Sequence, residues 1–260
     1  MKRPVPVPAT APFLRRVWLK AAGRAGVFPF SIPAIAARRF ELEFNTPVTI
    51  FVGDNGSGKS TILEGLASLC GFGEYGGSRN FRPAWQEALD TDRNDDFGSY
   101  LKASWSLRIT YGFFTRSETF NTLVAQIDEA AKGSGADAPH RSYGGRALSQ
   151  QSHGEAYLSV FENRLDDNGI YILDEPEAAL SPSHQIDFLR MLRRSEMSGR
   201  SQFFIATHSP VIMAYPGATL LHLTQHGILE RAFQTTHHFR ILREFYADPT
   251  GFMDAVFCDL

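Results

Sequence analysis

Residues 53–60, Gly-Asp-Asn-Gly-Ser-Gly-Lys-Ser, constrain the fold of this 260-residue chain more than any other segment. They fit the pattern G-x-x-x-x-G-K-[ST], with the apolar, β-branched run 48–52 directly before them and a helical pattern from Thr61 onward. This is the strand and helix context that the pattern requires. The glycines let successive backbone N–H groups face one anion, and the helix N-terminus adds its positive dipole end. The segment therefore predicts a loop that binds phosphate.

The residue types of this loop indicate how a nucleotide would be held. We expect Lys59 to reach the β- and γ-phosphates and Ser60 to ligate Mg²⁺. The remaining residues expected to contact the nucleotide are Gly53, Asp54, Asn55, Gly56, Ser57, Gly58 and Thr61.

A second motif lies at the end of another apolar strand. The run 170–173 is Ile-Tyr-Ile-Leu, and Asp174 and Glu175 follow it directly. An apolar strand that runs out into two acids is the Walker B arrangement. In it, Asp174 holds magnesium through its water shell and Glu175 polarises an attacking water. Such an acidic turn is common by itself, but together with a phosphate loop it predicts a hydrolytic site.

The apolar runs predict a mainly parallel sheet flanked by helices, an α/β fold. Runs of this kind lie at 48–52, 170–173, 203–206 and, more weakly, 220–223. Helical patterns lie between them. Further strands are expected at 17–19 and 40–44, which form a separate N-terminal β part, and a last helix should stop before Pro249.

We expect a flexible Pro-rich tail over residues 1–12 and a single domain over 13–260. An inserted lobe at about 71–165 interrupts the alternation of strands and helices. Within it, an alternating stretch over 107–111 predicts a strand, and an amphipathic helix is expected through 120–127.

Composition excludes several classes of protein. The chain has 26 Lys and Arg against 28 Asp and Glu, a formal charge of −2, so it is no broadly basic nucleic-acid coat. Its 2 cysteines lie far apart and imply neither a disulfide framework nor a zinc site. No apolar run is long enough to span a bilayer, and the N-terminus does not resemble a signal peptide. We therefore expect a cytoplasmic protein with no direct membrane insertion.

Taken together, the motifs resemble those of the ABC-class P-loop ATPases. The segment 149–155, Ser-Gln-Gln-Ser-His-Gly-Glu, resembles the ABC signature, 179–182 resembles the D-loop, and Thr207-His208-Ser209 resembles the switch histidine. Their form is most similar to that of stand-alone ATPases of the RecF, SMC and OLD kind, AAA family ATPases in broad naming. The resemblance covers most of residues 48–210 and implies an antiparallel N-terminal β part and a helical lobe that carries the signature.

The resemblance also implies a mechanism. It implies binding of Mg-ATP and hydrolysis by a head-to-tail homodimer, in which Ser152 and Gly154 close the partner's site and His208 senses the γ-phosphate. The driven process is expected to be DNA maintenance or defence, with DNA or a nuclease as partner. The alternative is the energising subunit of a membrane transporter, with a permease as partner.

Some assignments stay open on the sequence alone. Ser152 and Glu155 also fit the capping box S-x-x-E, and a capping role and a signature role can coexist. Phe28 and Phe30 are candidates for stacking on adenine, but aromatic residues at a domain edge are more often core residues.

A Gln loop of the transporter type cannot be placed. Gln86 and Gln126 both lie in helix-like context. Arg116 or Glu118, in the segment 112–118, can take its place.

Overall fold

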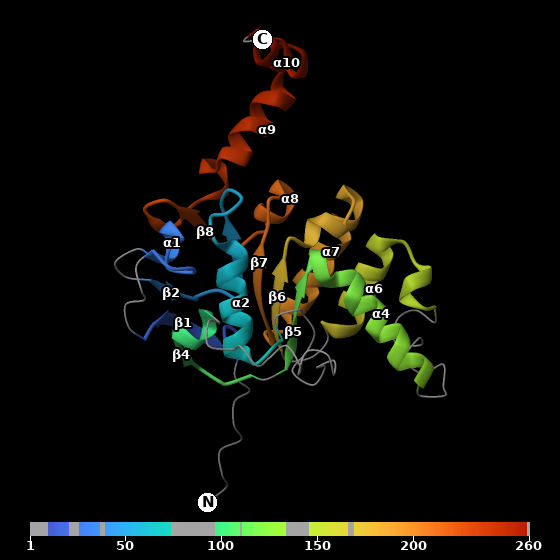
Figure 1. Cartoon of the computed structure of the whole chain (residues 1–260). Coiled ribbons are helices and arrows are strands. Elements are labelled where there is room, and N and C mark those ends of the chain that lie inside the picture. Colours follow the sequence, from blue (N-terminus) through green and yellow to red (C-terminus); the bar gives the residue numbers. More distant parts are fainter. Residues whose placement is uncertain are drawn as a thin grey trace, which may run out of the picture.

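A computed structural model of the chain describes residues 10–20, 26–36, 40–73, 97–109, 111–133, 146–165 and 169–258. The described residues form two sheets with helices packed against them (Figure 1). The larger sheet has the strand order β5-β6-β7-β3-β8-β9. Its strands are β3 (Val48–Val52), β5 (Gly112–Arg116), β6 (Gly169–Asp174), β7 (Ser201–Ala206), β8 (Thr219–Thr224) and β9 (Gly227–Glu230). Neighbouring strands are parallel except β8 and β9, which confirms the predicted mainly parallel sheet.

The register of the central strands brings three segments to one edge of the sheet. Ala206, the last residue of β7, pairs with Phe51 of β3 on one side and with Asp174 of β6 on the other. Because parallel strands end at a common edge, the residues that follow β3, β6 and β7 leave the sheet together. These are the three segments in which the sequence predicts the site.

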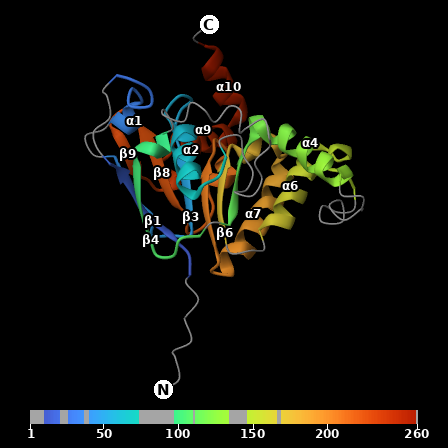
Figure 2. The ribbon, with the colours of Figure 1, turned by 60° about the horizontal axis from the view of Figure 1, so that its bottom comes forward.

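Helices cover both faces of the large sheet (Figures 1 and 2). The described helices are α1 (Pro33–Ala36), α2 (Lys59–Cys70), α4 (Ser117–Gly133), α6 (His153–Arg164), α7 (Pro182–Met197), α8 (Pro210–Met213), α9 (His237–Ala247) and α10 (Pro249–Phe257). Short 3₁₀ turns are η2 (Phe97–Tyr100), η3 (Leu148–Gln150), η4 (Pro176–Ala179) and η5 (Phe233–Thr235). Buried residues of α4, α6 and α7 pack in one apolar cluster and those of α2 in another, so the sheet separates two cores.

The smaller sheet is antiparallel, with the order β2-β1-β4. It comprises β1 (Leu14–Leu19), β2 (Glu41–Glu43) and β4 (Leu101–Trp105). Gln202 of β7 connects it to the large sheet: its side-chain oxygen accepts from the backbone of Phe13 at 2.8 Å and of Leu14 at 2.9 Å. Since Gln202 is fully buried, this amide satisfies backbone groups that water does not reach. The antiparallel N-terminal β part is thereby confirmed.

The segment expected to form an inserted lobe contributes to both sheets. Its residues 101–105 are β4 and its residues 112–116 are β5, the edge strand beside β6. The prediction of a strand over 107–111 was wrong, because the alternating residues of this stretch lie between β4 and β5. β5 is a short continuous buried run instead, and it begins at Gly112, whose close approach to Ile170 leaves no room for a Cβ. Residues 74–96 and 134–145 of the expected lobe lie outside the described residues.

The ends of the chain differ in how well they were predicted. Residues 1–9 of the expected tail lie outside the described residues, and Ala11 donates a backbone hydrogen bond to Gly199 at 2.9 Å. Helix α9 stops before Pro249 as predicted, but α10 follows it at once. Proline fits the first turn of a helix, and the Asp248 side chain caps this one by accepting from Gly251 at 3.0 Å. Across the ranges that the structure describes, no helix combines the length and apolar character needed to cross a bilayer.

Candidate functional site

The loop 53–60 connects β3 to α2, the context that the sequence predicts. Gly58 precedes α2 in the left-handed region at φ 102°, and a Cβ there would lie 2.7 Å from the Ile32 side chain. Gly53 has φ 155°, and its Cβ would lie 2.7 Å from the Ser57 hydroxyl. The tight curl of the loop therefore requires glycine at both positions. Asp54, Asn55 and Gly56 are exposed at its tip, whereas Ser60 and Thr61 lie half-buried in the first turn of α2.

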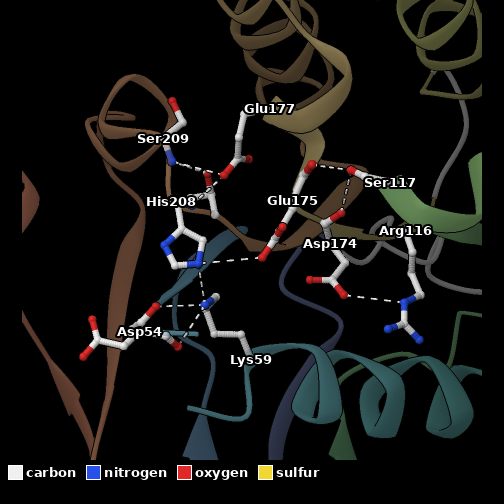
Figure 3. A network of polar contacts seen from close by, with 11 residues as sticks. Asp54, Lys59, Arg116, Ser117, Asp174, Glu175, Glu177, His208 and Ser209 are labelled. Atoms are coloured by element: carbon white, nitrogen blue, oxygen red, sulfur yellow. Dashed lines mark hydrogen bonds and ion pairs between the residues drawn. The ribbon is translucent and has the colours of Figure 1, made fainter. Parts of the chain in front are cut away.

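Lys59 is the buried cation of the site, only 5% exposed. Its Nζ donates to the backbone oxygens of Gly53 at 2.8 Å and Asp54 at 3.3 Å, and it lies 2.8 Å from Nε2 of His208 (Figure 3). A charged ammonium has donors only, so in this contact Nε2 of His208 is the acceptor. Burial lowers the pKa of Lys59, against the raising effect of the Glu175 and Asp174 carboxylates.

Asp174 is the buried acid of the site, 4% exposed at the end of β6. Its Oδ2 lies 3.7 Å from Nε of Arg116, and its Oδ1 is buried with no hydrogen-bond partner. Burial raises the pKa of this carboxyl to about 6, although the Ser60 hydroxyl and the Arg116 guanidinium act in the opposite direction. An unpartnered carboxylate oxygen beside a serine hydroxyl fits a hard divalent cation such as Mg²⁺.

Glu175 has an unusual backbone conformation. Its φ and ψ are both 53°, which makes it the one non-glycine residue with positive φ among the residues described. Its N–H donates to Ala206 at 2.9 Å, and its carbonyl accepts from the Ser117 hydroxyl. This turn costs about 1–2 kcal/mol for a residue with a Cβ. It places the half-exposed carboxylate 3.7 Å from Nε2 of His208.

Glu177 belongs to the site, and the sequence reasoning missed it. Its Oε1 accepts from the backbone N–H groups of His208 at 2.5 Å and Ser209 at 3.1 Å, so it fixes the segment after β7 (Figure 3). The sequence carried a signal for Glu177, because it is an acid two residues after Glu175, in the first turn of η4. Its partner segment could be found only from the pairing of β6 with β7.

Arg116 ends β5, and its guanidinium lies between two acids. Nη1 is 2.5 Å from Glu64 of α2, and Nε is 3.7 Å from Asp174. Glu118 points to solvent, with its side chain 84% exposed and 3.9 Å from Arg116. Of these two candidates for the Gln-loop position, Arg116 is the one that the structure places beside Asp174. Gln86 and the side chain of Gln126 lie outside the described part.

Ser152 caps α6, as the capping-box interpretation of its motif predicts. Its hydroxyl accepts from Glu155 N–H at 3.4 Å, and its own N–H donates to the Glu155 carboxylate at 2.9 Å. Ser152 is exposed, and within the described ranges no hydrogen bond or ion pair joins it to the loop 53–60. Gly154 packs against the D-loop segment, where a Cβ would lie 3.2 Å from the Ala179 carbonyl. The chain therefore presents Ser152, at the N-terminus of this helix, to solvent.

The two adenine candidates have different environments. Phe30 is 7% exposed and packs edge-on against Tyr100, with ring centroids 5.1 Å apart. It is a core residue. Phe28 is 65% exposed.

Comparisons with known proteins divide the site between two families. Residues 27–132, which include the phosphate loop, match a family described as "AAA domain". Residues 155–214, which include the acid pair and His208, match a family described as "AAA domain, putative AbiEii toxin, Type IV TA system".

One curated relative is the "DNA replication and repair protein RecF" of Heliobacterium modesticaldum. It is 31% identical over 132 residues, which cover 44% of this chain and 35% of that protein. The chain thus matches about a third of the length of this relative.

Among solved structures, the SMC head domain from Thermotoga maritima is 19% identical, with a TM-score of 0.45 over 85% of this chain and 99% of that one. An ATP-binding cassette of an ABC transporter in its ADP conformation is 14% identical, with a TM-score of 0.49 over 91% of this chain and 96% of that one.

The two AAA-domain matches cover the two halves of a single site. The register of the strands brings these two halves together at one edge of the sheet. The segment that carries Lys59 and the segment that carries Asp174 thus each match an AAA-domain family, in agreement with the sequence motifs. RecF adds a relative that is similar to part of the chain. The chain is a P-loop ATPase whose two site segments match AAA-domain families, and over 132 residues it is similar to RecF.

Proposed function

We propose that the chain binds Mg-ATP at the loop 53–60 and hydrolyses it at a site that a second copy of the chain completes. One observation carries the proposal: at the edge where β3, β6 and β7 end, Nε2 of His208 lies 2.8 Å from Lys59 and 3.7 Å from Glu175. A buried cation beside a general base is an arrangement suited to phosphoryl transfer to water.

Lys59 explains how the nucleotide would be recognised. Its present acceptors are two backbone oxygens of its own loop and Nε2 of His208. Phosphate oxygens carry more charge than these acceptors and form stronger hydrogen bonds with an ammonium. Bound ATP would therefore take donors of Lys59 from its present partners, and His208 would be free to face the γ-phosphate.

Ser60 and Asp174 are the residues that would hold magnesium. When bound, Mg²⁺ neutralises charge on the phosphate oxygens. In the part of the chain that the structure describes, no three His, Cys, Asp or Glu side chains group closely enough to hold a metal by themselves. This fits a magnesium ion that takes one carboxylate, one hydroxyl and oxygens of the nucleotide.

Glu175 is the proposed general base. Its carboxylate is half-exposed, so water reaches it, and it lies 3.7 Å from Nε2 of His208. Glu175 would accept the proton of the attacking water, while the ring of His208, with a proton on Nε2, would donate to an oxygen of the reacting phosphate. Glu177 is a positioning residue, because its carboxylate accepts from the backbone N–H groups of His208 and Ser209.

The exposed N-terminus of α6 supports a site shared by two chains. Ser152 and Gly154 lie at a helix N-terminus that makes no hydrogen bond or ion pair with the loop 53–60 of the same chain within the described ranges. Helix N-termini bind anions through their free N–H groups. A head-to-tail homodimer would place Ser152 and Gly154 of one chain on the γ-phosphate held by Lys59 of the other.

A DNA-maintenance or defence process is the proposed use of this cycle. The name of the RecF relative and the toxin–antitoxin description of the second family support it. The near-neutral charge of −2 means that any DNA contact would be local.

Glu175→Gln should retain ATP binding and lose turnover by about 10²- to 10⁴-fold, because the amide keeps the shape but cannot accept a proton. The trapped species should be a dimer. Fluorescent ATP analogue titration, phosphate release and light scattering in Mg-ATP measure the three quantities. Glu162→Gln, on the exposed side of α6, is the matched control and should behave as wild type. Wild-type turnover in Glu175→Gln would remove Glu175 as the base.

Glu177→Ala should lower kcat by about 10- to 100-fold with little change in ATP affinity, because two backbone N–H groups lose a charged acceptor. Glu177→Gln should recover most of the activity, since its carbonyl oxygen can still accept from His208 and Ser209. Steady-state kinetics of both variants test the positioning role. An Ala variant with unchanged kcat would contradict it.

Duplex DNA should raise the ATP turnover of the wild-type chain, and the effect should weaken as salt concentration rises. Glu175→Gln, with DNA added, should stay inactive. If turnover is the same with and without DNA at low salt, DNA is not the partner, although the ATPase assignment stands.

A further inference from the structure

Helices α9 and α10 form an arm that projects beyond the nucleotide edge of the sheet. Figure 1 shows α9 rising from the edge at which α2 begins, with α10 at its far end, and Figure 2 also shows α10 standing away from the sheet. No residue of either helix is buried. The residues of the arm are therefore exposed or only partly buried, although the arm stands next to the proposed nucleotide site.

The root of the arm is fixed at the nucleotide site. Thr236 is buried and caps α9 by accepting from Phe239 N–H at 3.2 Å. Phe239 packs edge-on against Phe233, with centroids 5.1 Å apart. The ring of His238 lies 5.9 Å from that of His208. The arm thus starts in contact with the residue proposed to face the γ-phosphate, and its direction is set by packed side chains.

Large apolar side chains on the arm are exposed. Both helices carry them, and they are Ile241, Tyr246, Met253, Val256 and Phe257, between 38% and 72% exposed. Within the arm, Phe245 packs against Phe252, with ring centroids 5.7 Å apart, which joins the two helices into one unit. Exposed apolar residues gathered on one unit are typical of a protein interaction surface.

The charge of the arm favours a protein over a nucleic acid. From Thr236 to Cys258 it carries Arg240 and Arg243 against Glu244, Asp248 and Asp254, so its formal charge is slightly negative. A surface that binds a polyanion needs an excess of positive charge. The position of the arm then indicates which protein binds it. Because the arm stands at the nucleotide edge, the protein that closes over this edge comes next to the arm.

We infer that the arm formed by α9 and α10 packs against a second copy of this chain when two copies close over ATP. The inference rests on the proposed head-to-tail dimer, whose surface it extends beyond the signature. By two-fold symmetry each chain gives one arm and receives one, so the contact is made twice. The apolar side chains of the arm are then covered only in the ATP-bound dimer.

The test uses the full chain with Glu175→Gln, which keeps ATP bound. Adding Tyr246→Ser and Phe257→Ser should raise the protein concentration needed for half-dimerisation in Mg-ATP by at least about tenfold. Met197→Ser is the matched control: Met197 is 73% exposed, like Tyr246 at 72%, but ends α7 near the opposite edge of the sheet. Its dimerisation should equal that of the parent. Thermal unfolding of each variant checks that the fold is retained.

The native cysteines provide a second readout. Cys258 is exposed at the end of α10, whereas Cys70 is buried and its pKa is raised to about 12 by burial, so a maleimide reports on Cys258. Mg-ATP should slow the labelling of Cys258 in the parent by at least about tenfold and should not slow it in the arm variant.

The outcomes separate this inference from the proposed function. A chain that fails to bind ATP overturns the proposed function itself. A chain that binds ATP but stays monomeric overturns the proposed two-chain site and the arm contact with it. An arm variant that dimerises like the parent, with unchanged Cys258 labelling, overturns the arm contact alone. Protection of Cys258 by duplex DNA without ATP would also overturn it, because the arm would then bind nucleic acid.

Discussion

The arrangement of the molecule depends on one buried cation, Lys59, at the edge where the central strands end. Its ammonium is 5% exposed and is satisfied by two carbonyls of its own loop and by the ring of His208. Burial makes the charged form costly, and the nearby acids Asp174 and Glu175 offset that cost. Such a site, with one buried cation and two acids, is suited to the proposed Mg-ATP, which would bring charges of both signs.

The acidic side of the site is held by the same strand pairing. Asp174 pairs in register with Ala206, so the turn at Glu175 comes next to the segment that carries His208. The left-handed conformation of Glu175 is maintained by hydrogen bonds to Ala206 and from Ser117. Local strain is thus offset by neighbouring elements, which is common where a side chain must face a reacting group.

Short-range patterns in the sequence were enough to predict the strands 48–52 and 170–173 and the motifs that follow them. These features need only local periodicity and neighbouring residue types. The role of Glu177 could not be predicted, and Arg116 could be named only as one of two candidates, because each depends on which strand lies beside β6 in space. The helix after Pro249 was missed because proline ends one helix and begins another equally well.

The central claim is that each nucleotide site is built from two chains, and mixing two inactive variants tests it most directly. Ser152→Arg and Lys59→Ala should each hydrolyse almost no ATP alone, since each lesion damages both sites of its homodimer. In an equal mixture about half the dimers are mixed, each with one intact site, so independent sites give about a quarter of wild-type turnover. Wild-type turnover by Ser152→Arg alone would contradict the account, because Ser152 would then be only a helix cap.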